Sequence, residues 1–201
     1  MMKRILSLHF FFLIFFTANA GTIQKGYHGF ADVGYDYCIS DLAPATISVT
    51  TSHGYQFSPF VFLGAGIGFD FTGSAEYSGE IKDITGYPYE KRDATVDIPL
   101  FFNGRFNFTK TKAVPFIDLR AGAYVNNEGG YYINAMLGCR ISLSDNSGLS
   151  FSVGVKGRKI TAQRLNFTSG NKYNGYKTSY YYEDDQNYPL ENISFKIGYD
   201  F

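Results

Sequence analysis

Few residues in this sequence could act as a general base. Beyond its first twenty residues the chain has two histidines, His28 and His53. Hydrolysis of an ester by nucleophilic catalysis needs a histidine beside a hydroxyl nucleophile and a carboxylate. Neither histidine belongs to the His-x-Ser pair of some lipid hydrolases, because Phe30 and Tyr55 stand at the serine positions. We therefore expect no enzymatic activity.

Metal, cofactor and disulfide chemistry has equally little support in the sequence. It contains no CxxC pair, HExxH segment or glycine-rich phosphate loop. The acidic run at residues 183–185 could touch a divalent cation, but a solvated loop is the simpler interpretation. Cys38 and Cys139 fall at opposite ends of the predicted strands that carry them, so we expect no disulfide between them. No cofactor and no metal are predicted.

Charged residues recur at alternate positions within otherwise apolar segments. Asp118 and Arg120, for example, alternate with Ile117, Leu119 and Ala121. Successive side chains of a β-strand point to opposite faces, so the charges would share one face and the apolar side chains the other. The predicted charged face carries both signs at similar depths: Asp32, Asp97, Asp118, Arg105, Arg120, Arg140, Lys156 and Lys196, together with Asp36, Asp70 and Asp200.

Eight segments with this period of two must position those charges. They are residues 27–37, 47–55, 60–71, 95–108, 117–125, 131–141, 149–156 and 192–201. If the N-terminus lies inside, the long links at 38–45, 72–93, 126–130 and 159–191 fall at one end and the short links at 57–59, 109–112 and 142–147 at the other. Outer-membrane barrels separate extracellular loops from periplasmic turns in this way. The sequence thus predicts an all-β chain folded as a transmembrane, antiparallel, up-and-down β-barrel of about eight strands.

Aromatic residues on the apolar face are predicted to gather at its two ends, as rings do at membrane–water interfaces. The outer ends carry Tyr35, Tyr37, Phe69, Phe71 and Tyr131, and the inner ends carry Tyr55, Phe106, Phe108, Tyr199 and Phe201. The last strand places Phe195, Ile197, Tyr199 and Phe201 on one face. This ending resembles the C-terminal signature that the barrel-assembly machinery recognises.

The barrel segments also carry a family resemblance. FVFLGAGIGFDF, IPLFFNGRFNF, PFIDLRAGAY and ISFKIGYDF are similar to segments of the small outer-membrane barrels of the OmpA/OmpX type, especially uncharacterised Bacteroidota-type members. The resemblance covers essentially the whole chain beyond its first twenty residues. It implies residence in a Gram-negative outer membrane, with membrane lipid, lipopolysaccharide and the barrel-assembly machinery as partners, and it implies no particular activity.

The first residues have the chemistry of an export signal. Residues 1–20 combine a basic start, an apolar core over 5–16 that is too short to span a bilayer, and a small-x-small site ending at Ala20. We expect a signal peptide over 1–20 and a barrel domain over 21–201 with both termini periplasmic.

The charge balance bears on partners. Removal of Lys3 and Arg4 lowers the 18 basic residues to 16 against 18 acidic ones, a net charge of −2 with neutral histidines. Nucleic acid is therefore not a predicted partner.

The function that these patterns favour is a non-enzymatic outer-membrane barrel that serves envelope structure or surface interaction through its extracellular loops. The interior of an eight-stranded barrel is just wide enough for side chains to fill, so opposite charges there should pair rather than line a pore. The loop over 159–191 holds tyrosines suited to adaptable recognition: Tyr173, Tyr176, Tyr180, Tyr181 and Tyr182. The same composition fits plain extensions of the flanking strands. A small pore or lipid-accommodating barrel with porin-like transport is the alternative, and a soluble lipocalin-like barrel is a more distant one.

Overall fold

The structure is a computed structural model that describes residues 23–39, 44–77, 90–126, 130–144, 147–169, 178–182 and 186–201. All regular elements in these ranges are β-strands. The described residues include no helix that is long and apolar enough to cross a membrane. The predicted signal peptide over 1–20 lies outside them.

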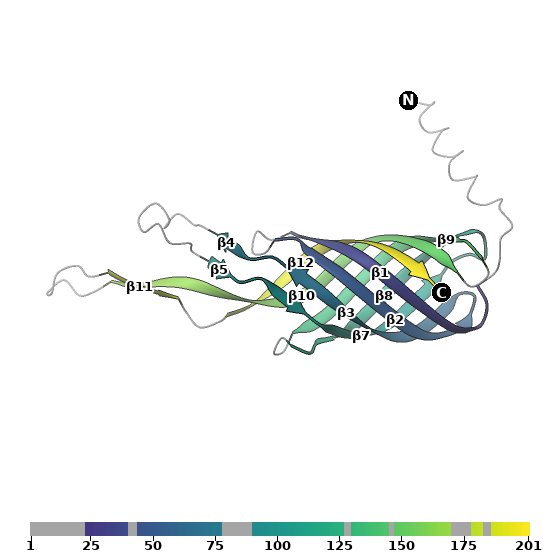
Figure 1. Cartoon of the computed structure of the whole chain (residues 1–201), viewed down its shortest axis with the longest axis horizontal. Helices are drawn as coiled ribbons and strands as arrows, with labels where there is room; N and C mark the ends of the chain where they lie inside the picture. Colours follow the sequence, from purple (N-terminus) through teal and green to yellow (C-terminus); the bar gives the residue numbers. More distant parts are fainter. Residues whose placement is uncertain are drawn as a thin grey trace, which may run out of the picture.

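Eight strands form the closed barrel of the described chain (Figure 1). They are β1 (Gly26–Cys38), β2 (Thr46–Ser58), β3 (Val61–Thr72), β6 with β7 (Thr95–Asp97 and Pro99–Asn107), β8 (Ala113–Tyr124), β9 (Tyr131–Ser142), β10 (Gly148–Ser169) and β12 (Gln186–Asp200). Each pairs antiparallel with the next along the chain. The predicted all-β barrel of about eight strands is confirmed.

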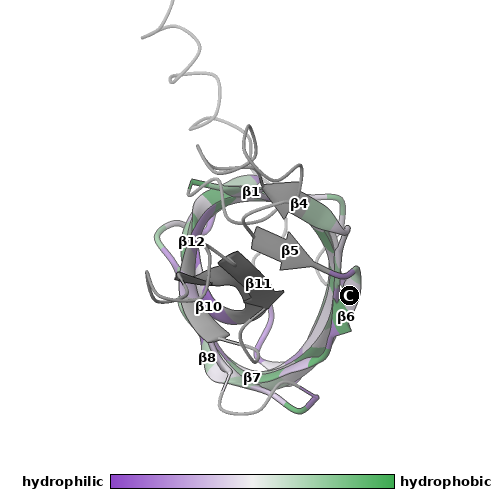
Figure 2. Cartoon of the chain, turned by 90° about the vertical axis from the view of Figure 1, so that its left-hand side faces the viewer, coloured by the Kyte–Doolittle hydropathy of each residue, from purple (hydrophilic) through white to green (hydrophobic). Residues whose placement is uncertain are grey.

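The seam between β1 and β12 closes the barrel, and Figure 2 shows the resulting ring viewed along its axis. Val33 pairs with Ile197 at mid-seam. At the end of the seam, Gly29 and Phe201 exchange backbone hydrogen bonds of 2.8 and 2.9 Å. Closure removes the unpaired N–H and C=O groups that a free edge strand would expose.

One barrel strand is interrupted, where the sequence predicts an unbroken strand over 95–108. Pro99 has no N–H to donate to a ladder, and the strand breaks at Ile98 into β6 and β7. The N–H and C=O groups of Ile98 form hydrogen bonds with the link after β8 instead. The Ile98 N–H donates to Asn126 Oδ1 over 2.8 Å, and the Val125 N–H donates to the Ile98 carbonyl over 3.0 Å.

The prediction of loops over 72–93 and 159–191 is wrong in part, because both ranges contain β-strands. The first contains the strands β4 (Ala75–Tyr77) and β5 (Glu90–Arg92), which pair with each other. In the second, β10 continues to Ser169, β12 begins at Gln186, and β11 (Thr178–Tyr182) pairs with the end of β10. These segments are rich in Thr and Tyr, which favour strands, and each finds a backbone partner beyond the barrel wall. β4, β5 and β11 lie together at one end of the barrel (Figure 1).

The barrel therefore has two distinct ends. We call the end that carries β4, β5 and β11 the loop end, and the end that carries Phe201 and the turns after β2, β7 and β9 the turn end. Each of those three turns joins consecutive strands across no more than five residues. The predicted sorting of long and short links is confirmed.

The two faces of the wall differ as the period of two predicts. Side chains of the predicted apolar set point outward and are exposed, such as Leu119 at 46%, Leu137 at 60% and Ile197 at 58%. The predicted aromatic sets are outward as well; all are exposed except Tyr131, which is half-buried. Inward positions hold the charges and small polar residues.

Candidate functional site: the charged lumen

The lumen contains a balanced set of buried charges. Six acidic and six basic residues are buried among the described residues, and none of these residues is more than 6% exposed: Asp32, Asp36, Asp70, Asp97, Asp118, Asp200, Arg105, Arg120, Arg140, Arg158, Lys156 and Lys196. All eleven charged residues that the sequence assigned to this face lie there. Because buried charges are costly without partners, their geometry decides what the lumen can do.

Asp118 on β8 is the centre of a first cluster. Its Oδ2 accepts from Arg105 Nη2 over 2.8 Å, and its Oδ1 accepts from Arg120 Nε over 2.8 Å. Arg120 continues to Asp32 Oδ2 on β1 over 2.7 Å, which crosses the lumen between strands that are not neighbours. Arg120 also donates to Thr50 Oγ1 over 2.9 Å.

Asp200 extends this cluster toward the turn end. Its Oδ2 accepts from Arg140 Nε over 2.7 Å and lies 3.4 Å from Arg105 Nη1. The resulting turn-end cluster holds three arginines and three aspartates, Arg105, Arg120, Arg140, Asp32, Asp118 and Asp200. Its formal charge is zero.

Lys156 on β10 is the centre of a second cluster nearer the loop end. Its Nζ donates to Asp36 Oδ2 over 2.7 Å and to Asp70 Oδ2 over 2.6 Å. Ser194 donates to the other oxygen of Asp36, and the Tyr124 hydroxyl donates to Asp70 Oδ2 over 2.6 Å. The ammonium group of Lys156 thus joins β10 to β1 and β3, and the two carboxylates extend the network to β12 and β8.

Arg158 completes the loop-end cluster. Its Nη1 lies 3.3 Å from Asp97 Oδ2, and its Nη2 donates to Thr46 and Thr72 over 2.8 and 3.0 Å. The two cations Lys156 and Arg158 face three carboxylates, so the loop-end cluster alone carries a formal charge of −1.

Lys196 supplies the balancing charge. Its side chain is 4% exposed, and its Nζ makes no hydrogen bond to the described residues. The Lys196 stem and Ser48 Oγ both lie close to the space where a side chain at position 34 would begin, so a larger residue there would displace them. Ser48 Oγ also makes no hydrogen bond to the described residues. With Lys196 the six buried basic and six buried acidic residues balance, and the total formal charge of the described lumen is zero.

Aromatic rings fill the space around the two clusters. Phe101 stacks on Tyr132 with ring centres 5.1 Å apart, and Tyr124 meets Tyr132 edge-on at 5.7 Å. The Arg105 guanidinium lies 3.8 Å from the centre of the Phe30 ring and 4.3 Å from that of Phe116. A guanidinium between two rings gains cation–π attraction.

Arg158, Tyr124 and Thr46 belong to this site although the sequence analysis did not assign them to it. Arg158 follows Lys156 by two residues, so continuing the alternation past position 156 would have placed it inward. Tyr124 was on the predicted inward face without a partner. Its pairing with Asp70 spans 54 residues and has no signal in the sequence.

The two histidines lie on opposite faces of the barrel wall. His28 is buried in the lumen, with Nε2 2.9 Å from the Gln24 carbonyl. His53 faces outward near the turn end, with Nδ1 2.6 Å from the Tyr27 hydroxyl and Nε2 3.0 Å from Thr51 Oγ1. Cys38 and Cys139 are not joined by a disulfide, as expected.

The structure describes the predicted C-terminal signal completely and the predicted tyrosine-rich loop only in part. Phe195, Ile197, Tyr199 and Phe201 point outward and are exposed on β12 and the residue after it. Tyr180, Tyr181 and Tyr182 are part of β11, whereas Tyr173, Tyr176 and the acidic run 183–185 lie outside the described residues. The described residues contain no group of three or more His, Cys, Asp or Glu arranged to hold a metal ion.

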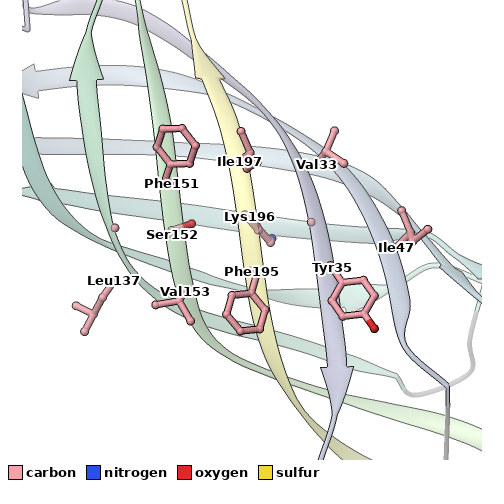
Figure 3. Close-up of a pocket in the computed structure, with 12 residues that line it drawn as sticks. Val33, Tyr35, Ile47, Leu137, Phe151, Ser152, Val153, Phe195, Lys196 and Ile197 are labelled. Atoms are coloured by element: carbon pink, nitrogen blue, oxygen red, sulfur yellow. The ribbon is translucent and has the colours of Figure 1, made fainter.

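The outer wall has an apolar groove between two rows of side chains. One row contains Val33, Phe151 and Ile197, and the other contains Ile47, Tyr35, Phe195, Val153 and Leu137 (Figure 3). The floor of the groove is backbone, including Gly34 and Gly138. Such a surface suits hydrocarbon rather than a polar ligand.

A scan against protein-family models and a search of curated proteins both find no match to this chain.

Proposed function

We propose that this chain is a non-enzymatic bacterial outer-membrane barrel with a closed lumen, serving envelope structure or surface interaction through the strands and loops at its loop end. The observation that carries the proposal is the distribution of polarity, which is the reverse of that in a soluble globular protein. Twelve charged residues of the described barrel are buried inside, and rows of large apolar side chains are exposed around the outside.

The exposed apolar surface supports a lipid environment. Soluble monomers rarely expose contiguous apolar patches larger than a few hundred Å². Here the mid-strand outward side chains of neighbouring strands form one surface, as Leu119, Ile133 and Leu137 do across β8 and β9. Exposed aromatic residues lie toward both ends of this surface. Transmembrane barrels show the same arrangement of an apolar band between two aromatic girdles.

The lumen supports a structural role over transport. Its charges are equal in number, and some ion pairs join opposite walls, for example Lys156 to Asp70 and Arg120 to Asp32. Moving an ion through would require breaking these pairs without water to replace them. A porin-like pathway is the alternative. It is favoured by the uncommitted polar atoms of Lys196, Ser48 and Asn134, which a water-filled path would satisfy.

The loop end supports a role in surface interaction. β10 extends past its barrel partners and pairs with β5 and β11, and β4 pairs with β5 in turn. The strands β4 and β11 each pair with one described strand. A strand with one unpaired edge can bind an extended peptide through main-chain hydrogen bonds.

Planar-bilayer recording of the purified, refolded protein tests the closed lumen. We expect no stable single-channel steps. Reproducible steps of one size would refute the closed barrel and favour the pore. The double variant K156M/R158M is the matched opening control, because it breaks the loop-end cluster. Membrane fractionation of a Gram-negative host that expresses the full chain tests the location, with recovery in the outer membrane expected.

A further inference from the structure

In the part of the turn end that the structure describes, the exposed charged side chains are lysines. In its described segments, residues 23–30, 52–62, 104–116, 138–144, 147–150 and 197–201, the acidic and arginine side chains are all in the lumen. The exposed charged side chains of these segments are Lys25, Lys110 and Lys112. None of the three has an ion-pair partner among the described residues.

These lysines lie beside the aromatic belt of the turn end. Lys110 Nζ is 5.0 Å from the centre of the Phe60 ring, which is itself 40% exposed. Lys25 precedes Tyr27, which is 66% exposed. A lysine whose stem runs along such rings holds its ammonium group on the polar side of the belt, at the depth of lipid headgroups.

Tyr27, His53 and Thr51 form a chain of hydrogen bonds on the outer wall near the turn end. Thr51 donates to the Phe30 carbonyl over 3.1 Å, so Thr51 Oγ1 is left to accept from His53 Nε2. His53 Nδ1 then accepts from the Tyr27 hydroxyl. Exposed groups that satisfy one another in this way fit the boundary between hydrocarbon and headgroups, where water is scarce.

We propose that Lys25, Lys110 and Lys112 bind the phosphodiester headgroups of anionic phospholipids in the leaflet that surrounds the turn end. This inference rests on the proposed membrane location and adds a lipid preference to it. A phosphodiester complements an ammonium that has no carboxylate partner, and the neighbouring rings accommodate the acyl chains of the same lipid. Each lysine near an anionic surface should favour anionic over zwitterionic lipid about fivefold.

Spin-labelled lipids test the proposal. The protein is inserted into phosphatidylcholine vesicles that contain a trace of spin-labelled phosphatidylglycerol or phosphatidylcholine, and the motionally restricted fraction of each label is measured. The wild-type chain should restrict the phosphatidylglycerol label several-fold more strongly. K25Q/K110Q/K112Q should lose most of this preference, and K25R/K110R/K112R should retain it.

The outcomes separate the two claims. Failure of the wild-type chain to insert as a heat-modifiable species in phosphatidylcholine would refute the membrane location itself. Normal insertion with an unchanged preference in the glutamine variant would overturn the lysine site, and so would loss of the preference in the arginine variant. Sodium phosphate and sodium chloride of equal ionic strength should weaken the preference equally. Stronger displacement by phosphate would assign the lysines to free phosphate and overturn the lipid site.

Discussion

Replacing Asp118 by alanine should destabilise the barrel strongly, because Asp118 holds two arginines. The change removes the 2.8 Å contacts to Arg105 and to Arg120 and leaves five buried acids against six buried bases. Removing one partner of a buried ion pair typically costs about 3 to 5 kcal/mol. In the variant, Arg105 would still contact Asp200 and the rings of Phe30 and Phe116, and Arg120 would still pair with Asp32. The loss should therefore be near the lower bound, about 3 kcal/mol.

The assay is urea-induced unfolding of the protein in lipid vesicles, followed by heat-modifiable gel mobility. Leu119→Ala is the matched control, since Leu119 is the next residue on the same strand and points outward. Hydrocarbon can fill the space that this change leaves, so it should cost less than Asp118→Ala. D118A/R105M restores charge balance with an apolar side chain between Phe30 and Phe116, and it should recover much of the lost stability.

Two results would refute this reasoning. If D118A were as stable as the wild-type protein, Asp118 would not be the paired, buried carboxylate that the structure shows. If D118A/R105M were less stable than D118A, the cost would not come from unbalanced charge.

Three further predictions concern the wall, the seam and the cysteines. Leu119→Arg or Leu137→Arg should cost about 2 to 4 kcal/mol in vesicle refolding, because each places a charge in hydrocarbon, and a cost near zero would contradict the outward lipid face. Deletion of Ile193–Phe201 removes most of the ladder to β1 and β10 and should abolish the heat-modifiable outer-membrane form, whereas deletion of Phe201 alone should slow assembly and leave a near-normal barrel. Arrival of the longer truncation at the cell surface would refute closure by β12. Gel mobility of the unfolded wild-type chain should be identical with and without reductant, and a faster band without reductant would reveal a Cys38–Cys139 bridge.

The faces of the strands could be predicted from the sequence because side-chain direction depends only on the period of two. Asp118 and Leu119 are neighbours in the chain and lie on opposite faces, as the alternation requires. The closure of the barrel could be predicted from strand number and link lengths. These are local properties or simple counts, so one sequence is enough to give them.

The partners inside the lumen could not be predicted in the same way. Lys156 meets Asp36 and Asp70 across separations of 120 and 86 residues. Which inward rows meet depends on the stagger of all the strands around the barrel, and no single segment specifies that stagger. The strand content of 159–191 was missed for a related reason. Its polar and tyrosine-rich composition fits a loop, and the pairing of its segments with one another and with β5 makes them strands.

The central claim is that the apolar face of this closed barrel meets lipid while its charged face does not. The chain has no tryptophan, so an introduced one is the sole indole reporter. Leu119→Trp places it on the outer wall, and Phe101→Trp places it in the lumen beside Tyr132. In vesicles of acyl-brominated phosphatidylcholine, we predict strong quenching of the fluorescence of L119W and weak quenching of heat-modifiable F101W. Equal quenching of the two variants, or no quenching of L119W, would contradict the account.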